Sequence, residues 1–577
     1  MKALRKAQRN CFTEPLHRSS NAVERFFSGS VLPTPPDTWL TSLMHAPSRR
    51  QSLLILGSLG LAAAAGGAYM LENHGGGAAD TPTAYDHGPG HRHSGQDDVN
   101  EGLEGQTNNA TGETVPALAL ALADDGAWRP DAPGYHAVDD EGHQIKGFAS
   151  ATSINVGESI DFHISVRPAQ GFKIKVYRLG RSAAGKGSEL IFTSPRISGT
   201  AQAALKVVEP TRTVVAPWEL SYTLKVPNTW RGGLYVATFE TEDKYRSCVP
   251  FVVREDDQAA DLLVVLPFTT YQAYNMYPVD KELGSSLYNA YLPSGKEGGA
   301  DICSTRVSFD RPYHQDGLPR LFELDQAFAQ WVEAQPYTIS YASSIDLHAG
   351  RIDPTKYKAL VFSGHDEYWS PQMRTVLQGA LTRGVSAAFM AANNVYWNIR
   401  LDPSQGGSQY RQVTCYKRHP DPEAKGGVAP TVLWRDLNQP EQQVLGSMYT
   451  AIITDAKPQP LVVNQTAHWF WSGTALKDGD QIPQLVAGEA DKVFPRVKGG
   501  PKATILAASP FTAEGPKNKP ITDTQQTVLC QYPSGAWVFD AGTFHWNHGL
   551  STPGFADPRI QRATRNLLDR MTGKRSA

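Results

Sequence analysis

Cysteine is scarce in this chain of 577 residues, and several common catalytic signatures are missing. There are 5 cysteines and no C-x-x-C pair, which excludes a zinc knuckle and a thioredoxin-type site. The sequence has no Lys/Arg run and a formal net charge of −2, which argues against nucleic acid as the main partner. It also lacks the G-x-S-x-G, H-E-x-x-H, P-loop and G-x-G-x-x-G motifs. Serine-hydrolase, zincin and nucleotide-binding chemistries are therefore disfavoured.

The N-terminal region has the pattern of an export signal. Residues 48–70 contain a twin arginine, an uncharged apolar run and then small residues, and together they resemble a twin-arginine signal. Residues 1–47 precede this pattern as an upstream region or an unusually long n-region, and Met44 is a candidate true start. We expect an exported protein, periplasmic or extracellular. The alternative is a retained membrane anchor formed by residues 52–71.

Two regions of different composition follow the signal. Residues 71–140 are rich in Gly, His and Asp and predict a flexible linker. Residues 141–255 alternate apolar and polar positions over short runs such as 160–166, 172–177 and 222–226, with turn residues between them. This spacing predicts an antiparallel, Ig-like β-sandwich. We expect it to pack or to bind, and we assign it no chemistry.

Residues 258–577 predict a three-layer α/β domain. The continuous apolar run 262–266 is typical of a strand that is buried on both faces. Further strands are expected at 338–341 and 536–539. Apolar residues at helical spacing predict two helices, one marked by Leu321, Leu324, Phe328 and Trp331 and a final one marked by Ile560, Ala563, Leu567 and Met571.

Two loops of this domain carry a dense set of polar and aromatic residues, Gly364–Ser370 and Ala392–Arg400. Each follows a buried strand, at 359–362 and 385–390. Between the strands, Ser370 as N-cap, Pro371 and Gly384 predict a helix with its start and its stop. A strand–helix–strand unit of this kind makes the strands parallel neighbours. Both loops should therefore leave the same carboxyl edge of the sheet, where open α/β sheets bind ligands.

These loops resemble a known family. Ser363–Trp369 with Asn393–Trp397 is similar to the C-terminal domain of the large subunit of N,N-dimethylformamidase, over roughly residues 258–577. The resemblance implies a fold similar to class I glutamine amidotransferases without their nucleophilic cysteine. Neither Cys303 nor Cys415 lies in an elbow-like G-x-C-x-G sequence, which agrees with the expected absence of a nucleophilic cysteine. Other matching pieces are Tyr288–Tyr291, Val307–Tyr313 and Cys415–Lys417.

The resemblance implies a mononuclear iron held by two tyrosines and one glutamate. By motif, the ligands would be Tyr368, Tyr396 and Glu489. Phenolate and carboxylate oxygens are hard anionic donors that suit ferric iron. Three protein ligands leave positions open, so the ion could polarise an amide and supply hydroxide. Alternatively, Tyr368 and Tyr396 are half-buried packing residues that bind no metal.

Other polar residues of the loops are candidates for catalysis. His365, Asp366 or Glu367 could move protons, and Asn393 or Asn394 could stabilise an oxyanion. His545 follows a predicted strand, and with Asn547 it is expected to line the same pocket. Alternatively, Asp366 and Glu367 are favourable charges just ahead of the predicted helix.

We therefore expect an exported metal-dependent hydrolase that acts on a C–N amide bond. The export signal and the fused sandwich do not support dimethylformamide itself, so the substrate would be another small amide or a glycan-linked group. One rival is a non-catalytic surface or polysaccharide-binding protein, and another is a decayed amidotransferase-like scaffold. The sequence leaves open whether the chain forms a homo-oligomer. We expect contact with a membrane only if the signal is retained as an anchor.

Overall fold

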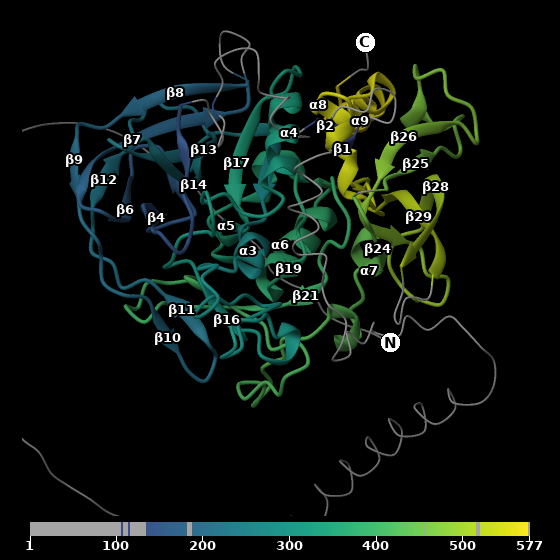
Figure 1. Cartoon of the computed structure of the whole chain (residues 1–577). Coiled ribbons are helices and arrows are strands. Elements are labelled where there is room, and N and C mark those ends of the chain that lie inside the picture. Colours follow the sequence, from purple (N-terminus) through teal and green to yellow (C-terminus); the bar gives the residue numbers. More distant parts are fainter. Residues whose placement is uncertain are drawn as a thin grey trace, which may run out of the picture. The chain divides into compact units, whose positions relative to one another are not determined.

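Figure 1 shows the computed structural model of the chain, which describes residues 106–107, 114–115, 128 and 134–574 apart from 182–186, 456 and 515–519. The predicted upstream region 1–47 with Met44, the export signal 48–70 and the alternative anchor 52–71 lie outside the described residues. Among the described residues, no helix is long and apolar enough to cross a membrane.

The region predicted as a β-sandwich consists of two sheets that share one core. One sheet has the order β3-β14-β13-β7-β8, with β5 on β14 and β9 on β7, and the other has the order β12-β6-β4. Phe162, Ile174 and Phe251 come from different strands and meet in the shared core. The strands predicted from alternation are confirmed, while the Ig-like type stays a prediction. The strands are β3 (His136–Ala137), β4 (Ile145–Ala149), β5 (Ser153–Asn155), β6 (Ser159–Val166), β7 (Gln170–Leu179), β8 (Ser188–Thr193), β9 (Ile197–Gly199), β12 (Tyr222–Lys225), β13 (Gly233–Thr241) and β14 (Tyr245–Arg254).

Part of the predicted linker belongs to the folded region. β1 (Gln106–Thr107) pairs with β2 (Thr114–Val115), and β3 begins before residue 141. The buried Trp128 donates from its indole Nε1 to Thr238 Oγ1 at 2.9 Å. Burial of so large an apolar ring ties Trp128 to the sandwich.

A mixed seven-stranded sheet organises the rest of the chain. Its order is β17-β15-β18-β20-β30-β29-β28. The strands from β17 to β30 pair in parallel, whereas β29 pairs antiparallel with both β30 and β28. Leu262 and Val264 pack on one face with α4 and α9, whereas Leu263 and Val265 pack on the other with α6. Helices thus flank both faces, and the similarity to glutamine amidotransferases stays a prediction. The strands are β15 (Ala260–Leu266), β17 (Ile339–Ser343), β18 (Tyr357–Phe362), β20 (Ser386–Phe389), β28 (Ala503–Glu514), β29 (Pro520–Gln531) and β30 (Trp537–Asp540).

The predicted helices are present with small changes at their ends. Helix α6 begins at Pro371, and the Oγ of Ser370 accepts a hydrogen bond from Met373 N at 3.3 Å. Gly384 adopts φ 87° just after it, a conformation that favours glycine. Leu321 is the N-cap of α4 and lies outside the helix that it was predicted to join. The helices are α3 (Phe268–Tyr274), α4 (Phe322–Val332), α5 (Ser344–His348), α6 (Pro371–Thr382), α7 (Gln442–Leu445), α8 (His548–Ser551) and α9 (Pro558–Thr572).

The remaining strands form small sheets apart from the large one. They are β10 (Lys206–Val208) with β11 (Thr213–Val215), β16 (Arg306–Ser308) with β23 (Gln412–Thr414) and β22 (Arg400–Asp402), β19 (Tyr368–Trp369) with β21 (Trp397–Asn398), β24 (Met448–Ile453) with β27 (Gly488–Lys492), and β25 (Gln459–Val462) with β26 (Gln481–Val486). Among them, β19, β21 and β27 carry residues of the site considered below.

Buried ion pairs join the sandwich to the mixed sheet. Arg178 of β7 donates to both carboxylate oxygens of Glu333, from Nη1 and Nη2, each at 2.8 Å. Tyr341 of β17 donates to the same carboxylate at 2.8 Å. Farther along, Asp346 accepts from Ser153 at 2.7 Å and from Arg254 at 3.1 Å. Because these groups are buried and paired, the sandwich is held in a fixed position on the sheet.

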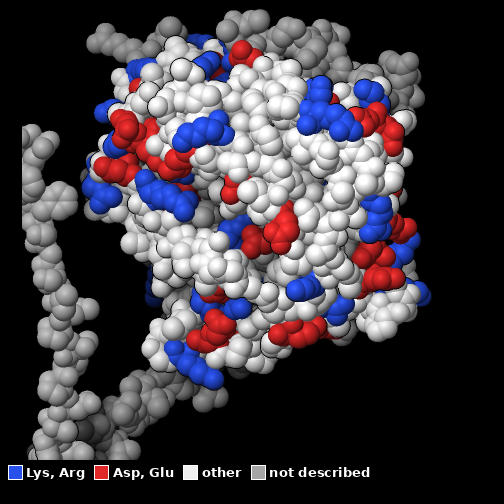
Figure 2. Space-filling model, turned by 90° about the vertical axis from the view of Figure 1, so that its left-hand side faces the viewer, with Lys and Arg blue, Asp and Glu red and all other residues white. Residues whose placement is uncertain are grey.

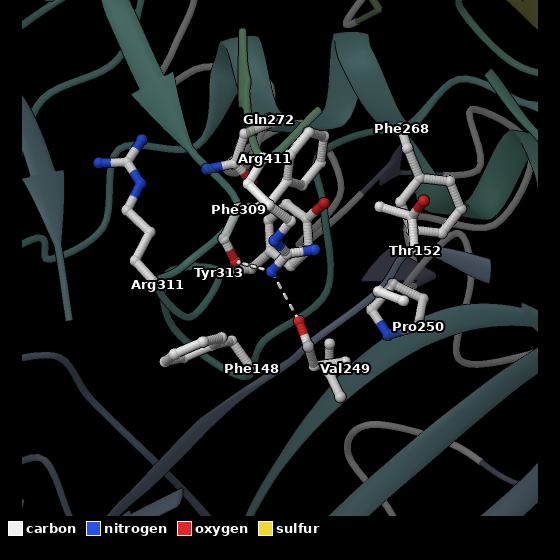
Figure 3. A pocket seen from close by; sticks show the side chains of 12 residues that line it. Phe148, Thr152, Val249, Pro250, Phe268, Gln272, Phe309, Arg311, Tyr313 and Arg411 are labelled. Atoms are coloured by element: carbon white, nitrogen blue, oxygen red, sulfur yellow. Dashed lines mark hydrogen bonds between the residues drawn. The ribbon is translucent and has the colours of Figure 1, made fainter. Parts of the chain in front are cut away.

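A small cavity of about 20 Å³ lies between the two regions (Figure 3). Val249 and Pro250 line it from the sandwich, and Phe268 and Tyr313 line it from the other side. Arg411 borders it and donates to the carbonyl oxygens of neighbouring chain segments. Its volume fits about one water molecule. No residue predicted for catalysis or metal binding lines this cavity.

The buried pair between Arg178 and Glu333 should matter to stability. Glu333→Leu leaves the Arg178 guanidinium buried without its counter-charge, so we expect the free energy of unfolding to fall by about 3–5 kcal/mol. In the double variant Arg178→Met/Glu333→Leu no charge is stranded, and most of the loss should be recovered. Chemical denaturation measures both. A single variant within about 1 kcal/mol of the wild type would show that the pair does not hold the interface.

Candidate functional site

The two predicted loops lie side by side at one edge of the mixed sheet. The strands that precede them, β18 and β20, are parallel neighbours, with Phe362 opposite Phe389. Within the loops, β19 pairs with β21 in parallel, and Tyr368 is opposite Trp397. The convergence predicted from the strand–helix–strand pattern is therefore confirmed.

The carboxylate of Glu367 is the centre of a buried hydrogen-bond cluster. Its side chain is 3% exposed. Tyr288 donates to Oε1 at 2.9 Å and to Oε2 at 2.7 Å, and Tyr274 donates to Oε2 at 2.8 Å. The indole of Trp397 donates to Oε1 at 3.0 Å. Both carboxylate oxygens thus have donors, which a buried charge requires.

The two tyrosines of this cluster come from a segment that precedes both loops. Tyr274 ends helix α3, which follows the first strand of the sheet, and Tyr288 lies 14 residues later. Their rings stack with centroids 4.4 Å apart, and their hydroxyl oxygens are 2.9 Å apart. Sequence reasoning missed Tyr274 and noted Tyr288 in a matching motif without giving it a role. The position of α3 directly after a buried parallel strand was the available signal.

His365 lies against the same carboxylate. Its Nε2 is 3.3 Å from Oε2 of Glu367, 3.8 Å from Oε2 of Glu489 and 3.4 Å from the Tyr274 hydroxyl. Its Nδ1 is 3.0 Å from the carbonyl oxygen of Ala392. A carbonyl only accepts, so we assign a proton to Nδ1. Burial opposes a charged imidazole, but Glu489 and Glu367 together raise the pKa of His365 above its ordinary value.

Glu489 faces His365 from strand β27. Burial raises the pKa of its carboxyl to about 7, with the charge of Glu367 adding to the effect. The side-chain amide of Asn393 hydrogen-bonds this carboxyl and opposes the increase. Asn393 has φ 54°, and its backbone N–H donates to both oxygens of Asp491 at 3.0 Å. Asn393 is thus held in a strained conformation beside Glu489.

Other predicted site residues have different surroundings. The side-chain amide of Asn394 donates to Asp540 at 3.1 Å and to the carbonyl of Ala391 at 3.2 Å, so these hydrogen bonds stabilise the loop. His545 contacts Asp455 at 3.1 Å and the carbonyl of Gln484 at 2.9 Å, in a second polar cluster. The ring that packs on His365 is that of the preceding residue, Phe544, at 4.6 Å. Asn547, expected in the same pocket, donates to the carbonyl of Ser363.

The two predicted tyrosine ligands differ in position. Tyr368 is buried with its ring edge-on to Tyr274 and Tyr288, at 6.5 and 6.3 Å, and its hydroxyl has no hydrogen-bond partner among the described residues. The ring of Tyr396 lies 5.4 Å from that of Tyr449, under the Arg435 guanidinium at 5.0 Å. Its backbone N–H donates to the carbonyl of Glu367 at 2.9 Å. Tyr368 is therefore a neighbour of the Glu367 cluster, and the Tyr396 ring packs against other residues.

Asp366 is a buried acid behind the cluster. Its two carboxyl oxygens have no hydrogen-bond partner among the described residues. Burial, followed by the nearby charge of Asp325, raises the pKa of Asp366 to about 8. Burial thus favours the protonated form of Asp366 near neutral pH, and its roles in proton transfer and as a charge ahead of helix α6 stay predictions.

Lys417 completes the cluster from the motif Cys415–Lys417. Its Nζ lies 3.4 Å from the ring centroid of Tyr288 and 5.0 Å from that of Trp397. Burial alone would raise the pKa of Glu367, but the hydrogen bond and charge of His365 and the charge of Lys417 hold it below its ordinary value. Glu367 is thus kept anionic among phenols.

The cluster offers oxygen donors to a cation. Among the described residues, no group of three or more His, Cys, Asp or Glu side chains could hold a metal ion. Tyrosine is not one of those residue types. Here the hydroxyl oxygens of Tyr274 and Tyr288 lie 2.7–2.9 Å from the carboxylate oxygens of Glu367. Oxygens about 2.8 Å apart are spaced like adjacent ligands around an ion with bonds of about 2.0 Å. The donor set therefore fits one hard cation.

The fold and this cluster define an α/β protein with an oxygen-rich site at the carboxyl edge of its sheet. The family described as N,N-dimethylformamidase beta subunit-like, C-terminal matches residues 173–561, and the chain belongs to this family. The match begins inside the sandwich, at β7, and so reaches further than the predicted 258–577. No curated protein matches the chain.

Solved structures resemble small parts of the chain. A cycloisomaltooligosaccharide glucanotransferase from Paenibacillus sp. is 13% identical over 26% of this chain and 19% of its own, with a TM-score of 0.14. The sporulation control protein Spo0M from Bacillus subtilis is 11% identical over 19% of this chain and 48% of its own, with a TM-score of 0.13. The chain thus spans less than half of either protein, and these likenesses carry no argument about fold or function.

Asp366 should make the stability of the metal-free protein depend on pH. The folded protein keeps a proton on this carboxyl up to about pH 8, whereas the unfolded chain releases it near the ordinary pKa of 3.8. Stability should therefore fall as the pH rises through this window. In Asp366→Asn the decline should be shallower, by up to about 1.4 kcal/mol per pH unit. Denaturation at pH 5, 6, 7 and 8 measures it, and equal slopes in both proteins would contradict the assignment.

Proposed function

We propose that the chain is a metal-dependent hydrolase of a C–N amide bond, with one iron ion held by Tyr274, Tyr288 and Glu367. The observation that carries the proposal is the set of hydrogen bonds of 2.7–2.9 Å between the two phenol oxygens and one buried carboxylate. The resemblance implies iron with two tyrosines and one glutamate as ligands, and this cluster has that composition.

This ligand set differs from the one predicted by motif. Tyr396 has its ring against Tyr449 and Arg435, and the Glu489 Oε2 lies 3.8 Å from the Nε2 of His365. Tyr274 and Tyr288 instead already point their hydroxyl groups at one carboxylate. Phenols that donate to a carboxylate become anionic ligands when a cation replaces their protons. We therefore favour them as ligands and leave Tyr368 beside the site.

When bound, the iron would polarise the amide carbonyl and lower the pKa of a bound water. His365 has its Nε2 next to this site, and the two nearby carboxylates raise its pKa and so favour a proton on Nε2. It is thus able to deliver that proton to the leaving amine as the C–N bond breaks. The carbonyl of Ala392 fixes the orientation of its ring through Nδ1.

Glu489 and Asn393 act on the opposite side of His365. A carboxyl with a pKa of about 7 exchanges its proton readily at neutral pH, which suits it to take a proton from water or from His365. Asn393 holds this carboxyl by a side-chain hydrogen bond. The charge of Lys417 keeps Glu367 anionic, so that it remains a ligand.

The cellular setting belongs to the same proposal. We take the protein to be exported to the periplasm or beyond, on the strength of residues 48–70, and to act on a small amide or a glycan-linked group. On the face shown in Figure 2, basic and acidic side chains of the described residues are interspersed, and neither sign forms one continuous patch. That distribution supports a partner other than nucleic acid.

Metal content tests the ligand set. Wild-type protein should carry iron, while Tyr274→Phe, Tyr288→Phe and Glu367→Gln should each retain less than about a tenth of it, because each removes an anionic donor. Tyr396→Phe is the matched control and should retain iron. Elemental analysis and the phenolate-to-iron absorption band measure both.

Other outcomes separate the alternatives. Full iron in Tyr274→Phe and Tyr288→Phe would contradict the proposal, and loss in Tyr368→Phe and Tyr396→Phe instead would favour the motif-based ligands. A wild-type protein that binds glycans without iron and without turnover would favour the polysaccharide-binding alternative.

A further inference from the structure

A second cation lies beside the proposed iron ligands and has no role so far. The guanidinium of Arg320 is 5.0 Å from the ring centroid of Tyr274. Tyr274 stacks on Tyr288, and Lys417 lies over the ring of Tyr288 at 3.4 Å. Since the inner faces of the two rings cover each other, Arg320 and Lys417 occupy the outer faces. Arg320 therefore borders the site on the side of Tyr274, away from Lys417.

Arg320 has no counter-charge of its own. Among the residues that the structure describes, no carboxylate forms an ion pair with it, and its buried Nε has no hydrogen-bond partner. Its side chain is partly exposed, so a ligand next to the Tyr274 ring can reach the guanidinium from solvent. The two Nη groups are not among the buried atoms and form no ion pair with a described residue, and a guanidinium in this state can bind a carboxylate through charge-assisted hydrogen bonds.

The carboxyl groups around Arg320 are already engaged or protonated. Glu489 faces His365 at 3.8 Å, and Asp455 pairs with His545 at 3.1 Å. Burial raises the pKa of Glu323 to about 7, so it is partly neutral. Arg320 is close enough to lower the pKa of all three, yet it pairs with none of them. Its charge therefore remains available to a ligand.

The sandwich holds the loop that carries Arg320. Cys248 of β14 donates its N–H to the carbonyl of Asp316 at 2.8 Å. Gly317 has φ 92°, and a Cβ at this position would lie 2.0 Å from the carbonyl oxygen of Cys248. Leu321, with φ 63°, then turns the chain into helix α4. The loop that leads to Arg320 is thus held in close contact with the sandwich, which favours binding without reordering of the backbone.

We propose that Arg320 binds an anionic group of the substrate, so that the substrate is an amide with a carboxylate close to the scissile bond, as in an N-acyl amino acid. This inference rests on the proposed amide hydrolase function. It adds a specificity residue outside the iron ligands, and it gives a role to a guanidinium that forms no ion pair among the described residues. A neutral amide such as a dialkylformamide would leave the guanidinium unpaired.

Binding of matched probes to the iron-loaded full chain tests this proposal. N-formylglycine carries the amide and a carboxylate, and N-formylglycinamide replaces the carboxylate by a neutral group. Isothermal titration should give wild-type protein a dissociation constant at least about tenfold lower for the acid than for the neutral probe, as expected for a charge-assisted pair. In Arg320→Gln the two constants should become equal, and Arg320→Lys should keep part of the preference.

Controls separate this role from structural support. Arg570→Gln removes an arginine that also lies 5.0 Å from an aromatic ring centroid, that of Trp469, and should leave the preference unchanged. Iron content should be the same in Arg320→Gln as in the wild type. Loss of iron from this variant would mean that Arg320 supports Tyr274 as an iron ligand, and it would overturn the proposal. No preference in the wild type, or an equal preference in Arg320→Gln, would also overturn it. Absence of iron from the wild type would instead reject the proposed function itself.

Discussion

The burial of one carboxylate, that of Glu367, is the constraint on which the site depends. A charged group at this depth is stable only with donors on its oxygens and a positive charge nearby. Tyr274, Tyr288 and Trp397 are the donors, and His365 and Lys417 are the charges. The same contacts tie three separate chain segments to the carboxyl edge of the sheet. An arrangement that satisfies a buried anion with phenols is also one that can accept a hard cation.

The sandwich takes part in this arrangement without belonging to the chemistry. Its ion pair between Arg178 and Glu333 and the contacts of Asp346 fix it against the mixed sheet. Through Cys248 it also holds the loop that ends at Arg320. The family match begins inside the sandwich and so spans parts of both regions. Removing the sandwich would thus disturb the loop that leads to Arg320 as well as the stability of the fold.

Local rules predicted the parts of the fold that depend on local sequence. Ser370, Pro371 and Gly384 bound a helix because capping and backbone preferences act over a few residues. The continuous apolar run at 262–266 is a central strand because both its faces are buried. The strand–helix–strand pattern around that helix predicted that β18 and β20 are parallel neighbours, and so it also predicted that the loops after them meet.

The choice of tyrosines could not be foreseen in the same way. The chain has 22 tyrosines, and those that meet Glu367 come from α3 and from a segment without regular periodicity. Tyr396 is next to Trp397, whose indole does reach Glu367, but its own ring packs on Tyr449. Neighbouring residues in an extended segment face opposite sides, so a motif does not say which ring enters the site.

The most direct test of this account is an experimental structure of the iron-loaded protein, with anomalous diffraction collected at the iron edge. The account predicts one anomalous peak in contact with the phenol oxygens of Tyr274 and Tyr288 and the carboxylate of Glu367. A peak held by Tyr368, Tyr396 and Glu489, or one that touches neither Tyr274 nor Tyr288, would contradict it.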